Sequence, residues 1–294
     1  MRSLKRKSLC QVQACDRVPF DDFKKVTLRS SPHFQRWITG LLIGLPVVVC
    51  VVAGPLWTLW LLVSLATLVG LWELHGLLFQ VQLPAKWRFF SFAAGLLMPF
   101  STYLWGTTGL DFALFVSFFV ALLLMLISSP LDRNEIDRIA LLSFCLLYLP
   151  YFISFVLLIG GAPQGRFWIL FILVVIVAGD VGAYYTGLRI GRHKLYQAVS
   201  PKKTVEGAIG GLFFSIVAGT VVGLIFLRNV PWPRFLFFSL TVAASGQVGD
   251  LIESMIKRNS GKKDSSSLLP GHGGLLDRLD SLIFTFPVLW ALLQ

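Results

Sequence analysis

Acidic side chains interrupt otherwise apolar segments in the second half of the chain. Asp250 and Glu253 end one such segment, Asp277 and Asp280 begin the next, and Asp180 lies late in an earlier one. A spacing of three residues places each pair on one face of a helix. Mg²⁺ prefers a few carboxylate oxygens supplemented by water and substrate phosphates. We therefore predict that Asp250 and Asp277 are catalytic metal ligands, with Asp180, Glu253 and Asp280 as further candidates.

Two of these acids also have a structural interpretation. Asp280 can pair with Arg278 or cap a helix. Glu253 can form an ion pair with Lys257, one helical turn later, which is worth about 0.3–0.5 kcal/mol on an exposed face. The two principal candidates are embedded in apolar sequence, where an unpaired charge is costly. We therefore expect a cation beside each of them.

The same region carries the positive charge and the glycines that a phosphate-handling site needs. Glycine lets the backbone approach phosphate oxygens, and a helix N-terminus favours an anion. Lys263 and His272 are the predicted catalytic partners of the two principal acids. His272 can donate to a phosphate or act as an acid/base, and a turn histidine bonded to the backbone is the alternative. The candidate phosphate-binding residues are Ser200, Lys202, Lys203, Thr204, Glu206, Lys257, Arg258, Asp264, Gly273, Gly274 and Arg278.

Several familiar catalytic motifs are missing from the sequence. It contains no G-x-x-x-x-G-K-[ST] element, no G-x-S-x-G and no H-E-x-x-H. It therefore gives no support for a P-loop, for a serine nucleophile or for a zinc peptidase. The four cysteines, Cys10, Cys15, Cys50 and Cys145, show no zinc-ligand spacing and no disulfide framework. Metal-assisted handling of phosphates is the chemistry that remains.

Membrane helices must position these residues. Of the 294 residues 55% are hydrophobic and only 14% are charged, and the mean hydropathy is +0.74, which is typical of a polytopic membrane protein. An apolar run of roughly 18 to 20 residues crosses a bilayer as a helix, because lipid offers no partner to unpaired backbone groups. We predict an all-α protein with about nine spans. They lie near 37–54, 56–79, 88–106, 110–129, 139–159, 167–187, 207–227, 233–252 and 275–293.

Positive charge is distributed unequally between the two sides of these spans. If the N-terminus is cytoplasmic, only Arg166, Arg228 and Arg234 of the 26 Lys and Arg fall on the opposite side. Cytoplasmic loops carry such an excess of Lys and Arg. We therefore predict a cytoplasmic N-terminus, a C-terminus on the opposite side and a site that faces the cytoplasm. The net charge of +11 then reflects membrane topology, and nucleic acid is not an expected partner.

The chain divides into a polar arm and a membrane domain. Residues 1–36 form a basic cytosolic arm, which is either a weakly ordered topology signal or a segment that touches anionic headgroups. Residues 37–294 form the membrane domain, with N-terminal helices at about 37–159 and catalytic helices and loops at about 167–294. No internal repeat is evident, which weakens a transporter built from inverted halves.

The block Ser254–Asp280 resembles the pattern of the phosphatidate cytidylyltransferase (CDP-diacylglycerol synthase) family. That pattern runs from a serine through K-R and K-D to H-G-G and D-R-aliphatic-D. A second block, 180–211, also resembles the family, and the likeness extends over about 37–294. The sequence departs from the pattern at Leu188, where a basic residue is common, and at Ser266, where glycine is common. The matching positions are Ser254, Lys257, Arg258, Lys263, Asp264, His272, Gly273, Gly274, Asp277, Arg278 and Asp280.

The resemblance implies a membrane nucleotidyltransferase of phospholipid biosynthesis. CTP and phosphatidate would react to CDP-diacylglycerol and pyrophosphate, with Mg²⁺ and a second metal site whose cation the sequence does not identify. Acyl chains would enter laterally between helices. The residues that would hold phosphates are Lys203, Lys257, Arg258, Lys263 and Arg278, and those that would orient them are Ser200, Thr204 and His272.

Two other functions stay open at this point. A CTP-dependent kinase of polyprenol or a similar lipid would use the same nucleotide and metal but transfer the γ-phosphoryl group. An anion transporter would need a charged path to the middle of the bilayer, whereas the charges here crowd one face. Membrane lipids are expected partners, and a homodimer is left open. The compact chain favours a bacterial inner membrane.

Overall fold

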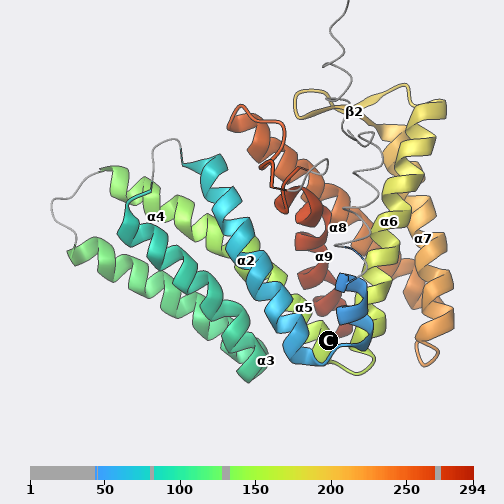
Figure 1. Ribbon diagram of the computed structural model, residues 1–294. Helices are drawn as coiled ribbons and strands as arrows, with labels where there is room; N and C mark the ends of the chain where they lie inside the picture. The colour runs from blue at the N-terminus through green and yellow to red at the C-terminus, as the bar shows by residue number, and fades with distance from the viewer. Residues whose placement is uncertain (1–43, 45, 80–82, 128–132, 269–272) are drawn as a thin grey trace, which may run out of the picture.

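The structure, a computed structural model, describes residues 44, 46–79, 83–127, 133–268 and 273–294 (Figure 1). The predicted basic arm, part of the first predicted span and His272 lie outside these residues. Within them the chain is helical apart from turns and one short hairpin. The expectation of a largely helical protein is therefore confirmed, and the hairpin is a departure from an all-α fold.

Six helices among the described residues are long and apolar enough to cross a membrane. A further helix, α9 (Leu276–Leu293), begins with charged residues and continues as an apolar segment. The six are α2 (Leu56–Leu78), α3 (Ala85–Ile127), a composite helix over Glu135–Gly161, α6 (Gly165–Ile190), α7 (Val205–Phe226) and α8 (Trp232–Asn259).

The composite helix has a defect at its centre. It joins α4 (Arg133–Leu146) to α5 (Phe152–Gly161) through a π-helical segment, Leu147–Tyr151. Pro150 lies in this segment. Proline lacks a backbone N–H and its ring opposes regular α-helical bonding, so a local widening of the helix at this place is expected.

Helix α3 is interrupted at Gly106. This residue has φ 63° and ψ −141°, a conformation that glycine adopts because it has no Cβ. Figure 1 shows the chain reversing here, so that the two arms of α3 lie side by side. Trp87, Met98 and Leu110, which come from both arms, belong to one apolar cluster. The break falls between the predicted spans 88–106 and 110–129.

Glycines bring α6 and α7 close together. A Cβ added to Gly207 would lie 2.9 Å from the carbonyl oxygen of Ala183, and one added to Gly211 would lie 2.9 Å from that of Gly179. Atoms in proteins do not approach a Cβ so closely, so larger side chains would force the two helices apart. The close packing fixes the start of α7 beside the second half of α6, which carries Asp180.

The segment between α6 and α7 forms a β-hairpin. Strands β1 (Lys194–Tyr196) and β2 (Ser200–Thr204) are antiparallel, with Lys194 opposite Thr204 and Tyr196 opposite Ser200. The predicted spans 167–187 and 207–227 imply a loop here, so the two strands were not predicted. The hairpin holds β2 in an extended form that leads directly into α7.

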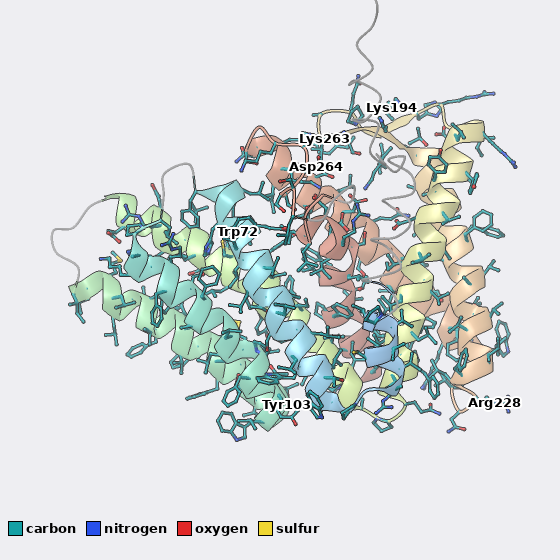
Figure 2. The ribbon with its side chains drawn as sticks, in the orientation of Figure 1. Trp72, Tyr103, Lys194, Arg228, Lys263 and Asp264 are labelled. Atoms are coloured by element: carbon teal, nitrogen blue, oxygen red, sulfur yellow. The ribbon has the colours of Figure 1, made fainter. Side chains whose placement is uncertain are left out.

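The segments that carry most of the described candidate site residues lie at one end of the helical bundle. This end carries the hairpin, the end of α2, the end of α8 and the start of α9 (Figure 1). Lys194, Lys263 and Asp264 lie here, whereas Tyr103 and Arg228 lie at the opposite end (Figure 2). We call the end that bears Lys194 and Lys263 the basic end.

Candidate active site

A cavity of about 430 Å³ lies between α6, α7 and α8 next to β2. Its volume falls within the range of small-molecule sites, roughly 300–1,000 Å³. Its lining carries four charged residues, and much of the rest is apolar or glycine. The four are Asp180, Lys202, Lys203 and Asp250. Such a cavity suits a ligand that combines a charged group with an apolar part.

Asp250 of α8 and Lys203 of β2 form an ion pair in this lining. Their side chains are 26% and 30% exposed, so a ligand can reach both of them. The Ser254 hydroxyl donates to Oδ1 of Asp250 at 3.4 Å. The cation that the sequence analysis expected beside Asp250 is therefore Lys203.

Three carboxylates from three helices converge beside this ion pair. Asp180 of α6, Asp250 of α8 and Asp280 of α9 are close enough to interact electrostatically with one another. Asp280 Oδ1 accepts a hydrogen bond from the backbone N–H of Ser281, at 2.6 Å, and Ser281 lines the cavity. Neighbouring negative charges repel, so cations stabilise this acidic cluster.

Asp277 belongs to a second, more buried cluster. Lys257 donates to Oδ1 of Asp277 at 2.7 Å and also pairs with Glu253. Oδ2 of Asp277 accepts from the backbone N–H of Gly274 at 2.8 Å and from the backbone N–H of Ser265 at 3.0 Å, and the Ser265 hydroxyl oxygen lies 3.0 Å from it. The proposed pair of Glu253 with Lys257 is thus confirmed. Lys257 serves as the cation for Asp277 and is not part of the cavity lining.

The arrangement of the acids bears on the predicted metal. Among the described residues, no group of three His, Cys, Asp or Glu side chains is placed to hold a metal ion. Mg²⁺ commonly uses one or two carboxylates and fills its other positions with water and substrate phosphates. Asp180 and Asp250 in the cavity fit this mode, because a ligand can reach them there. Asp277 could bind a metal only after it gave up hydrogen bonds that it accepts from the protein.

Strand β2 and the start of α7 place candidate phosphate ligands at the cavity. Lys202, Lys203 and Thr204 line it, and Ser200 begins the same strand. Thr204 caps α7, since its hydroxyl oxygen accepts from the backbone N–H of Gly207 at 3.1 Å. The N-terminus of a helix attracts anions. The predicted role of this strand in phosphate binding stays a prediction, and the geometry favours it.

Glu206 makes contacts with the protein itself. Its carboxylate accepts from the backbone N–H groups of Arg192, at 3.0 Å, and His193, at 3.2 Å. It also lies 2.6 Å from Nδ1 of His193. These contacts hold the turn between α6 and β1, which gives Glu206 a structural role beside the cavity.

The other predicted residues lie around the loop between α8 and α9. Arg258 donates to the carbonyl oxygens of Val199, at 3.3 Å, and Lys262, at 3.1 Å, and so links this loop to the hairpin. Gly273 has φ 81°, which favours glycine. Lys263, Asp264 and Arg278 are exposed.

Two polar residues at the site were missed by the sequence analysis. Gln247 lines the cavity and donates to the carbonyl oxygen of Ala208 at 3.0 Å. Glu73 of α2 is buried and contacts the loop before α9. An acid within an apolar span is an available signal for the second of these.

The fold and the cavity define a polytopic helical membrane protein with a site of lysines and carboxylates at one end. Residues 34–294 match the Cytidylyltransferase family, and the chain belongs to that family.

Comparison with individual proteins agrees with this assignment. The chain is 35% identical, over 235 residues, to the phosphatidate cytidylyltransferase of Bacillus subtilis (strain 168), and this covers 79% of the chain and 80% of that protein. It is 42% identical over 152 residues to the protein of the same name from Staphylococcus saprophyticus. It is 41% identical over 152 residues to that of Staphylococcus haemolyticus. Each staphylococcal match covers 51% of the chain and 58% of the relative.

Proposed function

We propose that this protein is a membrane-embedded phosphatidate cytidylyltransferase, which converts CTP and phosphatidate into CDP-diacylglycerol and pyrophosphate. Membership of the Cytidylyltransferase family and the names of its relatives support this activity. The observation that carries the proposal is the Lys203–Asp250 pair within a cavity whose walls are otherwise largely apolar. A lipid phosphate needs a cationic group to bind its phosphate and an apolar surface to contact its lipid part.

In the proposed reaction, a phosphate oxygen of phosphatidate forms a bond to the α-phosphorus of CTP. The bond from that phosphorus to the pyrophosphate oxygen breaks, and negative charge grows on the pyrophosphate. Lys202 and Lys203, which line the cavity, would bind phosphate oxygens, and the ion pair with Asp250 would orient Lys203. The start of α7 adds positive potential. Such a reaction depends mainly on positioning and electrostatics.

We assign Mg²⁺ to the acidic side of the cavity, held by Asp250 with Asp180 and with Asp280 nearby. When bound, it would polarise the phosphoryl groups and offset charge on the leaving pyrophosphate. Asp277 and Glu253 remain candidates for a second metal site, which could hold a different cation. Asp180 and Asp250 line the cavity and Asp280 interacts electrostatically with both, so this side carries three carboxylates, which supports the assignment.

We place the protein in a bacterial inner membrane, with the basic end in the cytoplasm where CTP is available. Arg228 lies at the opposite end from Lys194 and Lys263, which supports the predicted orientation. A count of nine spans includes α9, the helical residues 46–53 and the two arms of α3 counted separately. The other five spans are α2, the composite helix, α6, α7 and α8. Lipids would reach the cavity sideways between helices, and a homodimer is compatible with the lipid-facing helices.

The proposal is tested with purified protein, CTP and phosphatidate, with and without Mg²⁺. The expected products are a lipid with the mass of CDP-diacylglycerol and an equal amount of pyrophosphate. Release of CDP with a phosphorylated lipid would identify a lipid kinase instead. Flux of an anion through proteoliposomes without nucleotide would identify a transporter.

A further inference from the structure

Glu73 is a buried carboxylate that collects hydrogen bonds from a distant part of the chain. It is 2% exposed. Its Oε1 accepts from the Ser266 hydroxyl at 2.6 Å and from the backbone N–H of Leu275 at 2.9 Å. Its Oε2 accepts from the Ser265 hydroxyl at 3.0 Å and from the backbone N–H of Leu276 at 2.7 Å. Hydrogen bonds to a buried charge are strong, so these four donors are held firmly.

Two of the four donors belong to the start of α9. The first N–H groups of a helix have no partner within the helix and normally bind an N-cap side chain. The N-cap residue of α9 is Leu275, which cannot supply such a side chain. Glu73 therefore caps α9 from α2. In return, the positive end of the helix dipole stabilises the charge of Glu73.

Two further features fit this cap. Lys262 donates to the carbonyl oxygen of Gly76, near the end of α2, at 2.7 Å, which is a second link between α2 and the same loop. A Cβ added to Gly274 would lie 2.6 Å and 2.7 Å from the two carboxylate oxygens of Glu73. Only glycine at this position leaves the carboxylate room to reach the α9 backbone.

We propose that Glu73 is a positioning residue, which sets the orientation of the first turn of α9 and thereby of Asp277 and Asp280. The inference rests on the proposed function, in which these acids belong to the active site. Asp277 directly follows Leu276, and the Ser265 hydroxyl lies 3.0 Å from a carboxylate oxygen of both Glu73 and Asp277. A shift of α9 at this point therefore moves the second acidic cluster and Asp280 together.

The test combines Glu73→Gln with hydrogen exchange and kinetics. Glutamine keeps one acceptor oxygen but turns an NH₂ group toward a backbone donor, so half of the cap is lost at nearly constant volume. We expect faster exchange of at least one of the Leu275 and Leu276 amides, with α2 unchanged. We also expect kcat per folded molecule to fall about 10- to 100-fold, because small displacements of reacting groups are costly. The matched control is Glu135→Gln, which removes a carboxylate paired with Arg138 in α4. It should alter neither readout.

The outcomes separate a positioning role from a purely structural one. If Glu73 only stabilised the fold, Glu73→Gln would lower the thermal unfolding temperature while the folded fraction kept the wild-type kcat. That result, or unchanged exchange at Leu275 and Leu276, would overturn the proposal. If wild-type protein makes no CDP-diacylglycerol, the proposed function fails, whereas the exchange experiment still decides whether Glu73 caps α9.

Wild-type protein alone provides a second measurement in case the variant does not fold. The amide of Leu276 should exchange about 10-fold more slowly than the amide of Arg166 in the first turn of α6, whose N-cap residue Gln164 makes no side-chain cap. Equal exchange at the two helix starts would contradict the cap.

Discussion

Replacing Lys203 by methionine tests whether the cavity between α6, α7 and α8 is the reaction site. Methionine keeps an unbranched stem of similar length but removes the charge that faces Asp250. Loss of one electrostatic contact to a reacting group costs about 10²–10³-fold in rate, or about 2.7–4 kcal/mol of transition-state stabilisation. The two paired side chains are 30% and 26% exposed, so water screens their interaction. The free energy of unfolding should therefore fall by only about 1 kcal/mol or less.

The assay compares kcat/KM for CTP with the free energy of unfolding in the same detergent. Lys194→Met is the matched control, because Lys194 lies in the same hairpin and is exposed without lining the cavity. We expect wild-type kcat/KM for the control and a loss of at least about 100-fold for Lys203→Met. A Lys203→Met variant within about threefold of wild type would refute the assignment of this cavity.

Three further predictions concern the second cluster, the helix packing and the metal. Asp277→Asn should leave membrane insertion intact but lower turnover by about 10²-fold or more, because the ion pair with Lys257 is lost; near-normal turnover would exclude a role for Asp277 in the reaction. Gly211→Val should lower the free energy of unfolding by about 1–3 kcal/mol, because the valine side chain would collide with α6. The control Gly76→Ala should not destabilise the protein, because a Cβ added at this position meets no atom within 4 Å. Removal of divalent cations with a chelator should abolish formation of the cytidine lipid, and added Mg²⁺ should restore it; product formation at an unchanged rate in excess chelator would contradict the metal assignment.

Much of the fold follows from features that are local in sequence. Apolar runs predicted the long helices, and the boundary between the predicted spans 88–106 and 110–129 agrees with the break at Gly106 within α3. Acids at the ends of three apolar runs predicted carboxylates together at one end of the bundle, and Asp180, Asp250 and Asp280 interact there. This much could be predicted because helix length and the alternation of spans restrict where each helix end can lie. The sequence did not predict that Asp277, named with Asp250 as a principal metal ligand, would pair with Lys257 in a separate cluster.

Contacts between distant segments could not be predicted in the same way. Glu73 precedes its partners Ser265 and Leu276 by most of the length of the chain, and no periodicity relates them. Asp277 and Lys257 pair across a loop whose conformation the sequence does not dictate. The hairpin was missed because β1 and β2 are short, basic and lack the alternation of apolar and polar residues that indicates a strand.

The most direct test of the central claim follows the phosphorus atoms of CTP. Purified protein is supplied with phosphatidate and with CTP that carries the label either on the α- or on the γ-phosphorus. The account predicts that the lipid acquires the α-label alone, that pyrophosphate acquires the γ-label, and that Lys203→Met suppresses both transfers. Appearance of the γ-label in the lipid would contradict it.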